Sequence, residues 1–262
     1  MHKVEPKVFL VGETKIIEDG LQQYLNHIGV PDWVSDAPSD AEKLIEVNGR
    51  LCYKSFAPGL NRNVTKIREG NKPYMENILS SGHGSVLEHS WVNFIFADVS
   101  RVFTHELVRH RIGVAISQES LRYVRLDDLG QWLPTVIREN PEATNMFKKT
   151  FKHLEKLQLQ LAELFGLDNP SLPFSVKKKI TSAMRRIAPI GLATVIGWSA
   201  DIRALRWVIQ MRTDESAEEE IRFVFSKVAE IVISRYPNVF GDFEAIPGKD
   251  GISVYRPKNR KV

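Results

Sequence analysis

Residues 109–125 (RHRIGVAISQESLRYVR) carry the side chains best suited to bind an anion. The segment holds five basic groups and three short polar ones: Arg109, His110, Arg111, Arg122 and Arg125, with Gln118, Glu119 and Ser120. A guanidinium binds phosphate through two parallel hydrogen bonds, and hydroxyl or amide groups can add donors. The pattern therefore predicts a site for a phosphorylated small molecule. The alternative is a solvated basic face, because most surface charge contacts only water.

A second polar segment, SGHGSVLEHS at residues 81–90, precedes an apolar run. Gly82 and Gly84 allow the backbone to approach a ligand closely. His83 and His89 are candidate metal ligands, but neither their spacing nor a third ligand supports such a site. The HELVRH segment also differs from the zinc motif HExxH, because its histidines are five residues apart and do not share a helix face. We expect no metal site.

The composition is that of an ordinary soluble protein. The chain has 262 residues, which suits one large domain or two small ones, and its net charge of +4 is too small to require nucleic acid as a partner. A single cysteine, Cys52, excludes an internal disulfide and a multi-cysteine metal site. We see neither a signal peptide nor an apolar run long enough to cross a membrane, so we expect a cytoplasmic protein.

Hydrophobic periodicity predicts alternating strands and helices. We expect strands at 7–11, 91–99 and 190–198, and helices at 14–29, 40–52, 100–111, 143–166, 175–187, 200–212 and 216–234. Ser39 and Ser100 are predicted helix caps. Residues 112–117 are predicted to be a flexible link that bends at Gly113 and lets the arginine-rich helix end fold toward SQESLRY. The tail, 247–262, is expected to fray.

Three separated motifs, in order, resemble the flavin-dependent thymidylate synthases. RHR followed by SLR resembles the family signature RHR-x7-S-x-R, GHGSVLEH resembles its Gly-His segment, and RRIAP with DIRALRWVIQMR resembles its C-terminal half. The resemblance covers roughly residues 45–125 and 180–235. It implies an α+β fold with a central, mostly antiparallel sheet flanked by helices, together with a long helical segment. We expect one domain over 1–262, with residues 1–40 and 247–262 the least anchored parts.

The resemblance also implies chemistry. The family methylates C5 of dUMP with 5,10-methylenetetrahydrofolate, FAD relays hydride from NADPH, and no cysteine attacks the ring. It implies a homotetramer with active sites at subunit interfaces. The matched flavin contacts are Ser85, Arg109, His110, Arg111, Gln118, Asp201, Arg203 and Trp207. The matched nucleotide contacts are Glu106, Arg109, Gln118, Glu119, Ser120, Leu121, Arg122, Arg185 (or Arg186) and Arg212. Arg212 is the matched catalytic residue, because a cation beside the uracil would stabilise negative charge that develops on the ring.

Several positions depart from the family pattern. Eight residues, rather than seven, separate RHR from S-x-R. Asp201 stands where the family usually has Asn, and an ionised carboxylate cannot donate a hydrogen bond. Trp207 replaces a polar flavin neighbour, and Ser216 replaces a common His. These changes motivate an alternative, a related flavoprotein that modifies C5 of another pyrimidine nucleotide.

A further alternative is a nucleic-acid-binding module that uses the basic segment. It would show steep salt dependence and no flavin colour. The lack of aromatic residues interleaved with the arginines argues against it. His110 alone could also be a half-buried packing histidine.

Overall fold

The computed structural model describes all residues, 1–262, and the chain divides into two compact units. Unit 1 comprises Met1–Phe9, Ile95–Arg109 and Ile116–Trp198. Unit 2 comprises Leu10–Phe94, His110–Ala115 and Ser199–Val262. None of the helices is both long and apolar enough to cross a membrane.

A four-stranded sheet has the strand order β2-β3-β6-β4, so β4 is an edge strand. Each of these strands contributes residues to both units: β2 (Lys7–Glu13), β3 (Trp91–Ser100), β4 (Val114–Gln118) and β6 (Ala193–Asp201). In β3 the residues from Trp91 to Phe96 alternate between exposed and buried, as expected when one face of a sheet is covered. The expected α+β class with an antiparallel sheet and a long helix is confirmed.

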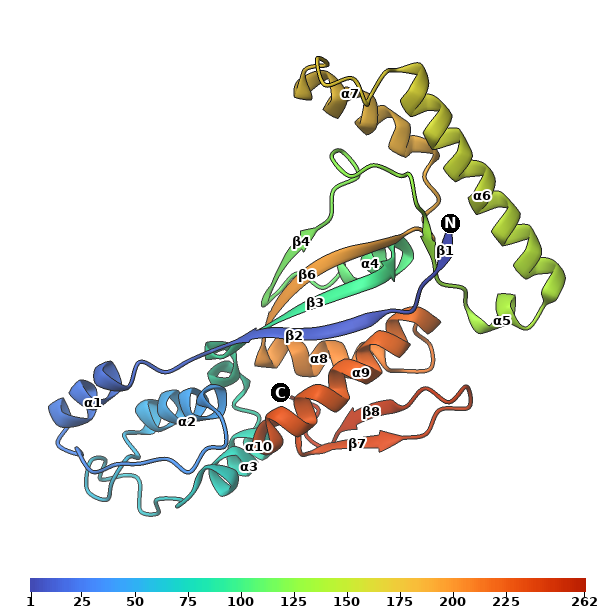
Figure 1. The fold of residues 1–262 in the computed structure, drawn as a ribbon. Coiled ribbons are helices and arrows are strands. Elements are labelled where there is room, and N and C mark those ends of the chain that lie inside the picture. Colours follow the sequence, from blue (N-terminus) through green and yellow to red (C-terminus); the bar gives the residue numbers. More distant parts are fainter. The chain divides into compact units, whose positions relative to one another are not determined.

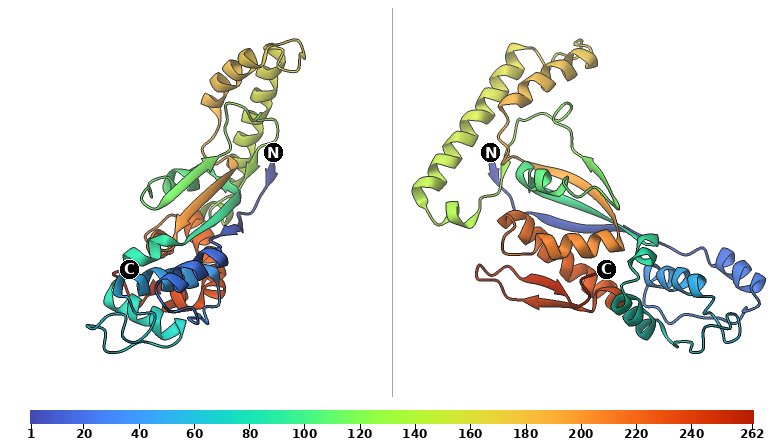
Figure 2. Two further views of the ribbon diagram at one scale, coloured as in Figure 1. Left: turned by 90° about the vertical axis from the view of Figure 1, so that its left-hand side faces the viewer. Right: turned by 180° about the vertical axis from the view of Figure 1, so that it is seen from behind.

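Unit 1 is built around the longest helix of the chain. Its other elements are β1 (His2–Lys3), α4 (Arg101–Leu107), β5 (Gly130–Gln131), α5 (Thr135–Arg138), α6 (Pro141–Leu164), α7 (Phe174–Met184) and the 3-10 turn η2 (Arg185–Ile187). Figure 1 and both views of Figure 2 show α7 beside the far end of α6. Ala162, Leu167 and Met184 pack together there, and Gln158 donates to the Met184 carbonyl at 3.1 Å.

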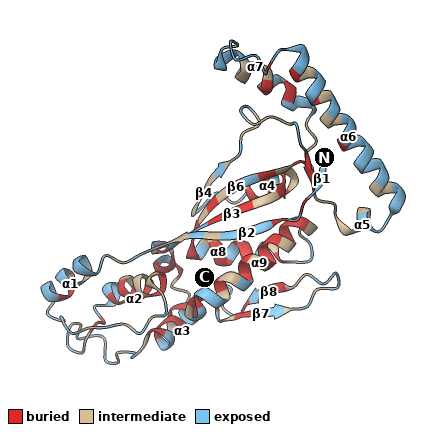
Figure 3. Ribbon diagram, viewed as in Figure 1, coloured by how far each residue is buried: buried red, intermediate tan, exposed pale blue.

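Unit 2 contains most of the remaining helices and a hairpin. Its elements are α1 (Glu18–His27), α2 (Asp40–Tyr53), α3 (Asn71–Ser81), the 3-10 helix η1 (Gly84–His89), α8 (Ile202–Arg212), α9 (Glu219–Arg235), α10 (Pro237–Phe240), β7 (Phe243–Ile246) and β8 (Val254–Pro257). Figure 3 shows buried faces along α8 and α9, which pack against each other. Apolar side chains on these buried faces include Leu205, Val208 and Phe225.

Several local predictions are confirmed by hydrogen bonds. The Ser39 hydroxyl accepts from the backbone N–H of Glu42 at 3.2 Å, and the Ser100 hydroxyl accepts from that of Phe103 at 3.1 Å. Each bond satisfies a backbone donor that the first turn of a helix leaves unpaired. Gly113 has a φ of 67°, so the predicted bend lies in the left-handed region that glycine tolerates.

Two predictions around the arginine-rich segment are wrong. Helix α4 ends at Leu107, so residues 109–111 lie beyond it instead of forming a helix end. The predicted flexible link at 112–117 is mostly strand β4. Beyond the helix, the backbone turns at Gly113 directly before it enters the sheet at Val114.

Other corrections concern burial and strand length. Strand β2 continues past its predicted end at residue 11 to Glu13, and none of its residues is buried. The apolar side chains of α6 are only partly packed, because Phe147 is 41% and Leu164 is 76% exposed. The tail does not fray: β8 pairs antiparallel with β7, and Val262 is buried.

Candidate functional site

The N-terminus of α8 is fixed by Asp201, which was predicted to contact flavin. Its carboxylate accepts from the backbone N–H of Ala204 at 2.7 Å, and its own N–H donates to the Gly113 carbonyl at 2.9 Å. Burial raises the pKa of this carboxyl, and the charge of Glu88 adds to the rise, although the Ala204 bond opposes it. A side chain at Gly113 would collide with the carboxylate, because an added Cβ would lie 2.0 Å from its Oδ2. Asp201 thus acts here as a buried helix cap.

The outer side of the first turn of α8 carries Arg203, which faces helix η1. Arg203 Nη1 donates to Glu88 Oε1 at 2.6 Å, and both side chains are about half exposed. An added Cβ at Gly84 would lie 2.6 Å from Arg203 Nε. The space left by Gly84 is therefore filled by this guanidinium, so the glycine allows the close approach of Arg203. Ser85, next in the chain, is exposed.

One helix turn further along α8, Trp207 presents its ring to solvent. It is 53% exposed, whereas Arg206 beside it is fully buried. Arg206 is held by Asp242 through two hydrogen bonds of 2.7 and 3.0 Å, and it also donates to the Val239 carbonyl. Arg203 and Trp207 are four residues apart and thus share one face of the helix. That face combines a cation with an exposed aromatic ring.

At the last turn of α8, Arg212 meets His110. Arg212 Nε donates to His110 Nε2 at 2.7 Å. The imidazole accepts only while Nε2 is unprotonated, so the bond places the ring proton on Nδ1. Two motifs separated by about a hundred residues are joined by this bond. His110 is therefore more than a packing histidine, because a hydrogen bond fixes the predicted catalytic arginine to it.

In unit 1, the end of β4 is held against α4. Gln118 Nε2 donates to Thr104 Oγ1 at 3.0 Å, and Arg101 Nη2 donates to the Glu119 carbonyl at 2.9 Å. The Glu119 N–H also donates to the Val195 carbonyl of β6 at 2.9 Å. These bonds fix the start of the SQESLR turn on two neighbouring elements.

The turn itself presents Arg122 to solvent. The Ser120 hydroxyl accepts from the backbone N–H of Arg122 at 3.3 Å, and the Ser120 carbonyl accepts from Tyr123 and Val124. Leu121 packs with the Leu129 and Phe151 cluster, which anchors the turn. The Arg122 guanidinium is exposed and has neither a hydrogen bond nor an ion pair. It is available for an anionic ligand.

Arg101 is a candidate site residue that the sequence interpretation missed. Its Nε is buried without a hydrogen-bond partner. Burial lowers the pKa of Arg101, and the nearby positive charge of Arg185 lowers it further, while Glu119 opposes the change. Two arginines that repel each other would both be stabilised by an anion. The only sequence signal was an arginine directly after a capping serine.

The predicted residues fall into two sets. Unit 2 holds most of the predicted flavin contacts together with the predicted catalytic residue: Ser85, His110, Arg111, Asp201, Arg203, Trp207 and Arg212. Unit 1 holds most of the predicted nucleotide contacts: Glu106, Arg109, Gln118, Glu119, Ser120, Leu121, Arg122 and Arg185. Arg109 and Arg111 are both exposed, and Glu106 is half-buried on α4. Arg109 of the RHR motif thus belongs to unit 1, and His110 and Arg111 belong to unit 2.

Comparisons with known proteins agree with the motif order. The family described as Thymidylate synthase complementing protein matches residues 34–238, which includes the segment 127–175 that no motif anchored. A flavin-dependent thymidylate synthase of Mycobacteroides abscessus is 32% identical over 85% of this chain and 87% of its own length. The corresponding protein of Corynebacterium diphtheriae is 34% identical over 84% and 86%.

A solved structure supports the fold. The crystal structure of Thymidylate Synthase X from Helicobacter pylori with FAD and dUMP aligns with a TM-score of 0.59 and 18% identity, covering 91% of this chain and 98% of the other. The match of the family over most of the chain, at more than 30% identity to its members, establishes the relationship. The chain belongs to the flavin-dependent thymidylate synthase family.

Proposed function

We propose that this chain methylates dUMP at C5 to give dTMP, with 5,10-methylenetetrahydrofolate as the one-carbon donor, FAD as cofactor and NADPH as reductant. The observation that carries the proposal is the bond between Arg212 and His110, which joins the family's RHR motif to its C-terminal arginine motif. A relative named a flavin-dependent thymidylate synthase matches this chain over 87% of its own length.

The residues on and around α8 fit a flavin. A flavin dinucleotide carries a pyrophosphate and planar rings, which need cations, hydroxyl donors and apolar or aromatic surface. Arg203, Ser85 and Trp207 supply these groups, and the Trp207 ring is exposed where a buried residue would be expected. We propose that these residues, together with His110, Arg111 and Asp201, hold FAD, with Arg109 and Gln118 completing its contacts. Bound FAD would supply hydride transfer, with NADPH as the source.

The residues of unit 1 fit the phosphate of a nucleotide. Ser120 supplies a hydroxyl and Arg122 an unpaired guanidinium, which suits a dianionic phosphate. Arg185 and Arg101 add positive charge near Glu119. We propose that Glu106, Arg109, Gln118, Glu119 and Leu121 shape the rest of this nucleotide site.

In the reaction, Arg212 stabilises negative charge on the pyrimidine. A guanidinium fixed beside the ring stabilises charge that develops as C5 becomes nucleophilic, and it does so without reorganising during the reaction. The Arg212–His110 bond provides that fixed position. The mechanism needs no thiol nucleophile, and the only cysteine, Cys52, is exposed on α2.

We also propose a cytoplasmic homotetramer with active sites at subunit interfaces. Three neighbouring strands of unit 1 expose apolar side chains: Phe9 at 47%, Ile95 at 37% and Val195 at 37%. Exposed apolar residues that cluster on a sheet mark an interaction surface. In light scattering, Ile95→Glu should lower the molar mass from that of a tetramer. A tetramer that survives this change would argue against this face as an interface.

The function is tested by dTMP formation. The purified protein is mixed with FAD, dUMP, methylenetetrahydrofolate and NADPH, and dTMP is measured by chromatography. Arg212→Ala should retain flavin absorbance but lose turnover by about 10²–10³-fold, the usual effect of removing a charge-stabilising donor. Glu215→Ala, an exposed change in the loop after α8, is the matched control and should be unaffected. Normal turnover in Arg212→Ala would contradict the proposed role.

A second candidate is a related enzyme that acts on another pyrimidine nucleotide. Asp201 favours it, because a buried carboxylate with a raised pKa changes the polarity beside the flavin residues. Turnover of another pyrimidine nucleotide, with dUMP left unconverted under the same conditions, would establish this candidate.

A further inference from the structure

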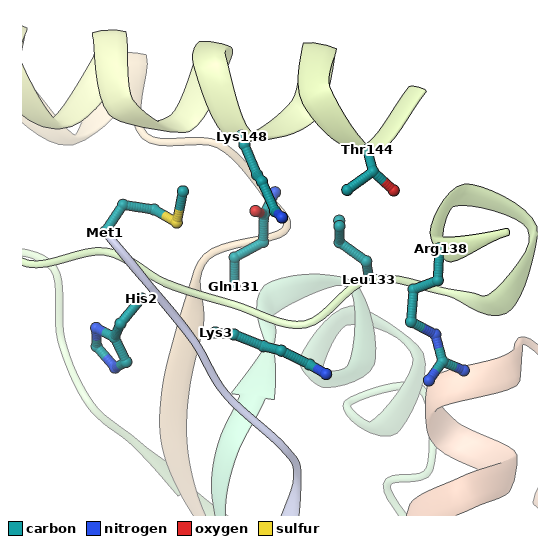
Figure 4. A pocket seen from close by; sticks show the side chains of 8 residues that line it. All are labelled: Met1, His2, Lys3, Gln131, Leu133, Arg138, Thr144 and Lys148. Atoms are coloured by element: carbon teal, nitrogen blue, oxygen red, sulfur yellow. The ribbon is translucent and has the colours of Figure 1, made fainter. Parts of the chain in front are cut away.

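A cavity of about 460 Å³ lies in unit 1, apart from every residue assigned above. It is lined by Met1, His2, Lys3, Gln131, Leu133, Arg138, Thr144 and Lys148 (Figure 4). Its volume is within the range of pockets that bind small organic molecules. None of the lining residues is acidic, whereas several are basic.

The wall of the cavity contains a buried polar group without a partner. Gln131 is only 4% exposed, and its side-chain Nε2 makes no hydrogen bond. Leaving a buried donor unpaired costs about 1–3 kcal/mol, so native proteins rarely do so without a ligand or a functional reason. The Gln131 backbone is held in place, because its carbonyl accepts from Val4 at 3.1 Å. The residue is therefore held at the cavity wall, where both N–H groups of its side-chain amide lack a partner.

Two lysines line the cavity, one on β1 and one on α6. Strands β1 and β5 pair in parallel with Lys3 opposite Gln131, so these side chains are neighbours on the ladder. Thr144 and Lys148 are four residues apart on α6 and share one helix face. Figure 4 shows Lys148 pointing from α6 toward Gln131, whereas Lys3 extends below Leu133 and away from Gln131.

The charge of these lysines is not compensated. Neither Lys3 nor Lys148 has an ion-pair partner. His2 is already bonded to Asp128 at 2.9 Å, and the Thr144 hydroxyl already donates to the Ile137 carbonyl at 2.7 Å. Arg138 lies at the cavity edge, with its guanidinium over the Trp132 ring at 5.9 Å. The free donors of the cavity are therefore the two ammonium groups and the Gln131 amide, beside apolar contacts from Met1 and Leu133.

We propose that this cavity binds a small organic anion, with a carboxylate or phosphate group beside Lys148 and Gln131 and an apolar body against Met1 and Leu133. The Gln131 amide donates to an oxygen of the same ligand. None of its lining residues is among the proposed FAD and dUMP contacts, so the test is run with both bound. Its failure would leave the proposed function untouched.

The test uses a fluorescent anion and its neutral analogue. The protein, saturated with FAD and dUMP so that the catalytic site is filled, is titrated with 8-anilinonaphthalene-1-sulfonate and, separately, with uncharged N-phenyl-1-naphthylamine. We expect saturable binding of the sulfonate, and binding about tenfold weaker in Lys148→Ala and in Gln131→Leu. Lys149→Ala, the adjacent lysine of α6 outside the cavity, is the matched control and should bind like the wild type.

Three outcomes would overturn the proposal. These are equal affinity for the sulfonate and the neutral analogue, equal binding by the Lys148→Ala and Lys149→Ala variants, and absence of saturable binding. Thermal unfolding of each variant shows whether the fold is retained, and Gln131→Leu keeps the test valid if a lysine variant is unstable. Competition with benzoate and phenyl phosphate then identifies the acid group. Displacement by either supports the proposal, and displacement by neither contradicts it.

Discussion

Replacing Arg122 with alanine should weaken dUMP binding without weakening the fold. The guanidinium is exposed and has no protein partner, so its removal leaves no buried group unpaired. A hydrogen bond to a charged group contributes about 1.5–3 kcal/mol. Because about 1.4 kcal/mol corresponds to a factor of ten, we expect the Kd for dUMP to rise by about 10–150-fold. Arg122→Lys should give an intermediate Kd, since it keeps the charge but loses the planar fork.

The assay is calorimetric titration of the FAD-loaded protein with dUMP, together with thermal unfolding of each variant. Arg125→Ala is the matched control, because this nearby arginine is paired with Asp168 at 2.8 Å and should leave the Kd unchanged. Loss of that exposed pair costs at most about 1 kcal/mol of stability. A Kd for Arg122→Ala within twofold of the wild type would refute the assignment of Arg122 to the phosphate.

Three further predictions concern stability. Asp201→Asn keeps a helix cap, so its free energy of unfolding in urea should be about 1 kcal/mol higher than that of Asp201→Ala. Equal stability of the two variants would rule out the capping role. The bond from Arg235 lowers the pKa of Glu13 from 4.5 to about 2, so its stabilisation is present above pH 4.5 and is lost as pH falls toward 2. Because Arg235 is half exposed, we expect the free energy of unfolding to fall by only about 1 kcal/mol over this pH range. Glu13→Gln should remove that part of the pH dependence. An unchanged slope of unfolding free energy against pH in this variant would contradict the assignment to Glu13. Arg206→Met removes the charged partner of Asp242, whose carboxylate then keeps only its bonds from Asn259, and should cost about 3–5 kcal/mol in urea unfolding. A cost below about 1 kcal/mol would contradict the importance of the pair.

Local signals predicted the elements best. Ser39 and Ser100 cap helices as their sequence contexts indicate, because a capping hydroxyl bonds backbone groups only two or three residues away. Residues 112–117 were misassigned because β4 is short and lies at the sheet edge, where five residues give too little alternation to recognise. This segment forms a strand because it pairs with β6, which is distant in the sequence.

Side-chain burial on α8 could not be read from residue type. Arg206 is buried and Trp207 is exposed, which reverses the usual order of charged and aromatic residues. The burial of Arg206 depends on Asp242, which lies 36 residues later in the chain. The tail was also predicted wrongly from its composition, because β8 is stabilised by its pairing with β7.

The family motifs named more candidate site residues than the types and spacing of the residues alone. Spacing alone indicated an anion site near Arg122 but did not reveal Arg101, whose approach to Arg185 depends on the fold. The Arg212–His110 bond likewise joins distant segments, and no local rule predicts it. The buried cap formed by Asp201 gives that departure from the family pattern a structural role.

The most direct test of the account is dTMP formation by wild-type protein and by Cys52→Ala, each with FAD bound and after FAD is stripped. Chemistry that needs no thiol predicts equal rates for the two FAD-loaded proteins and loss of dTMP from both when FAD is removed. A Cys52→Ala protein that keeps its flavin but forms no dTMP, or a stripped protein that still forms it, would contradict the account.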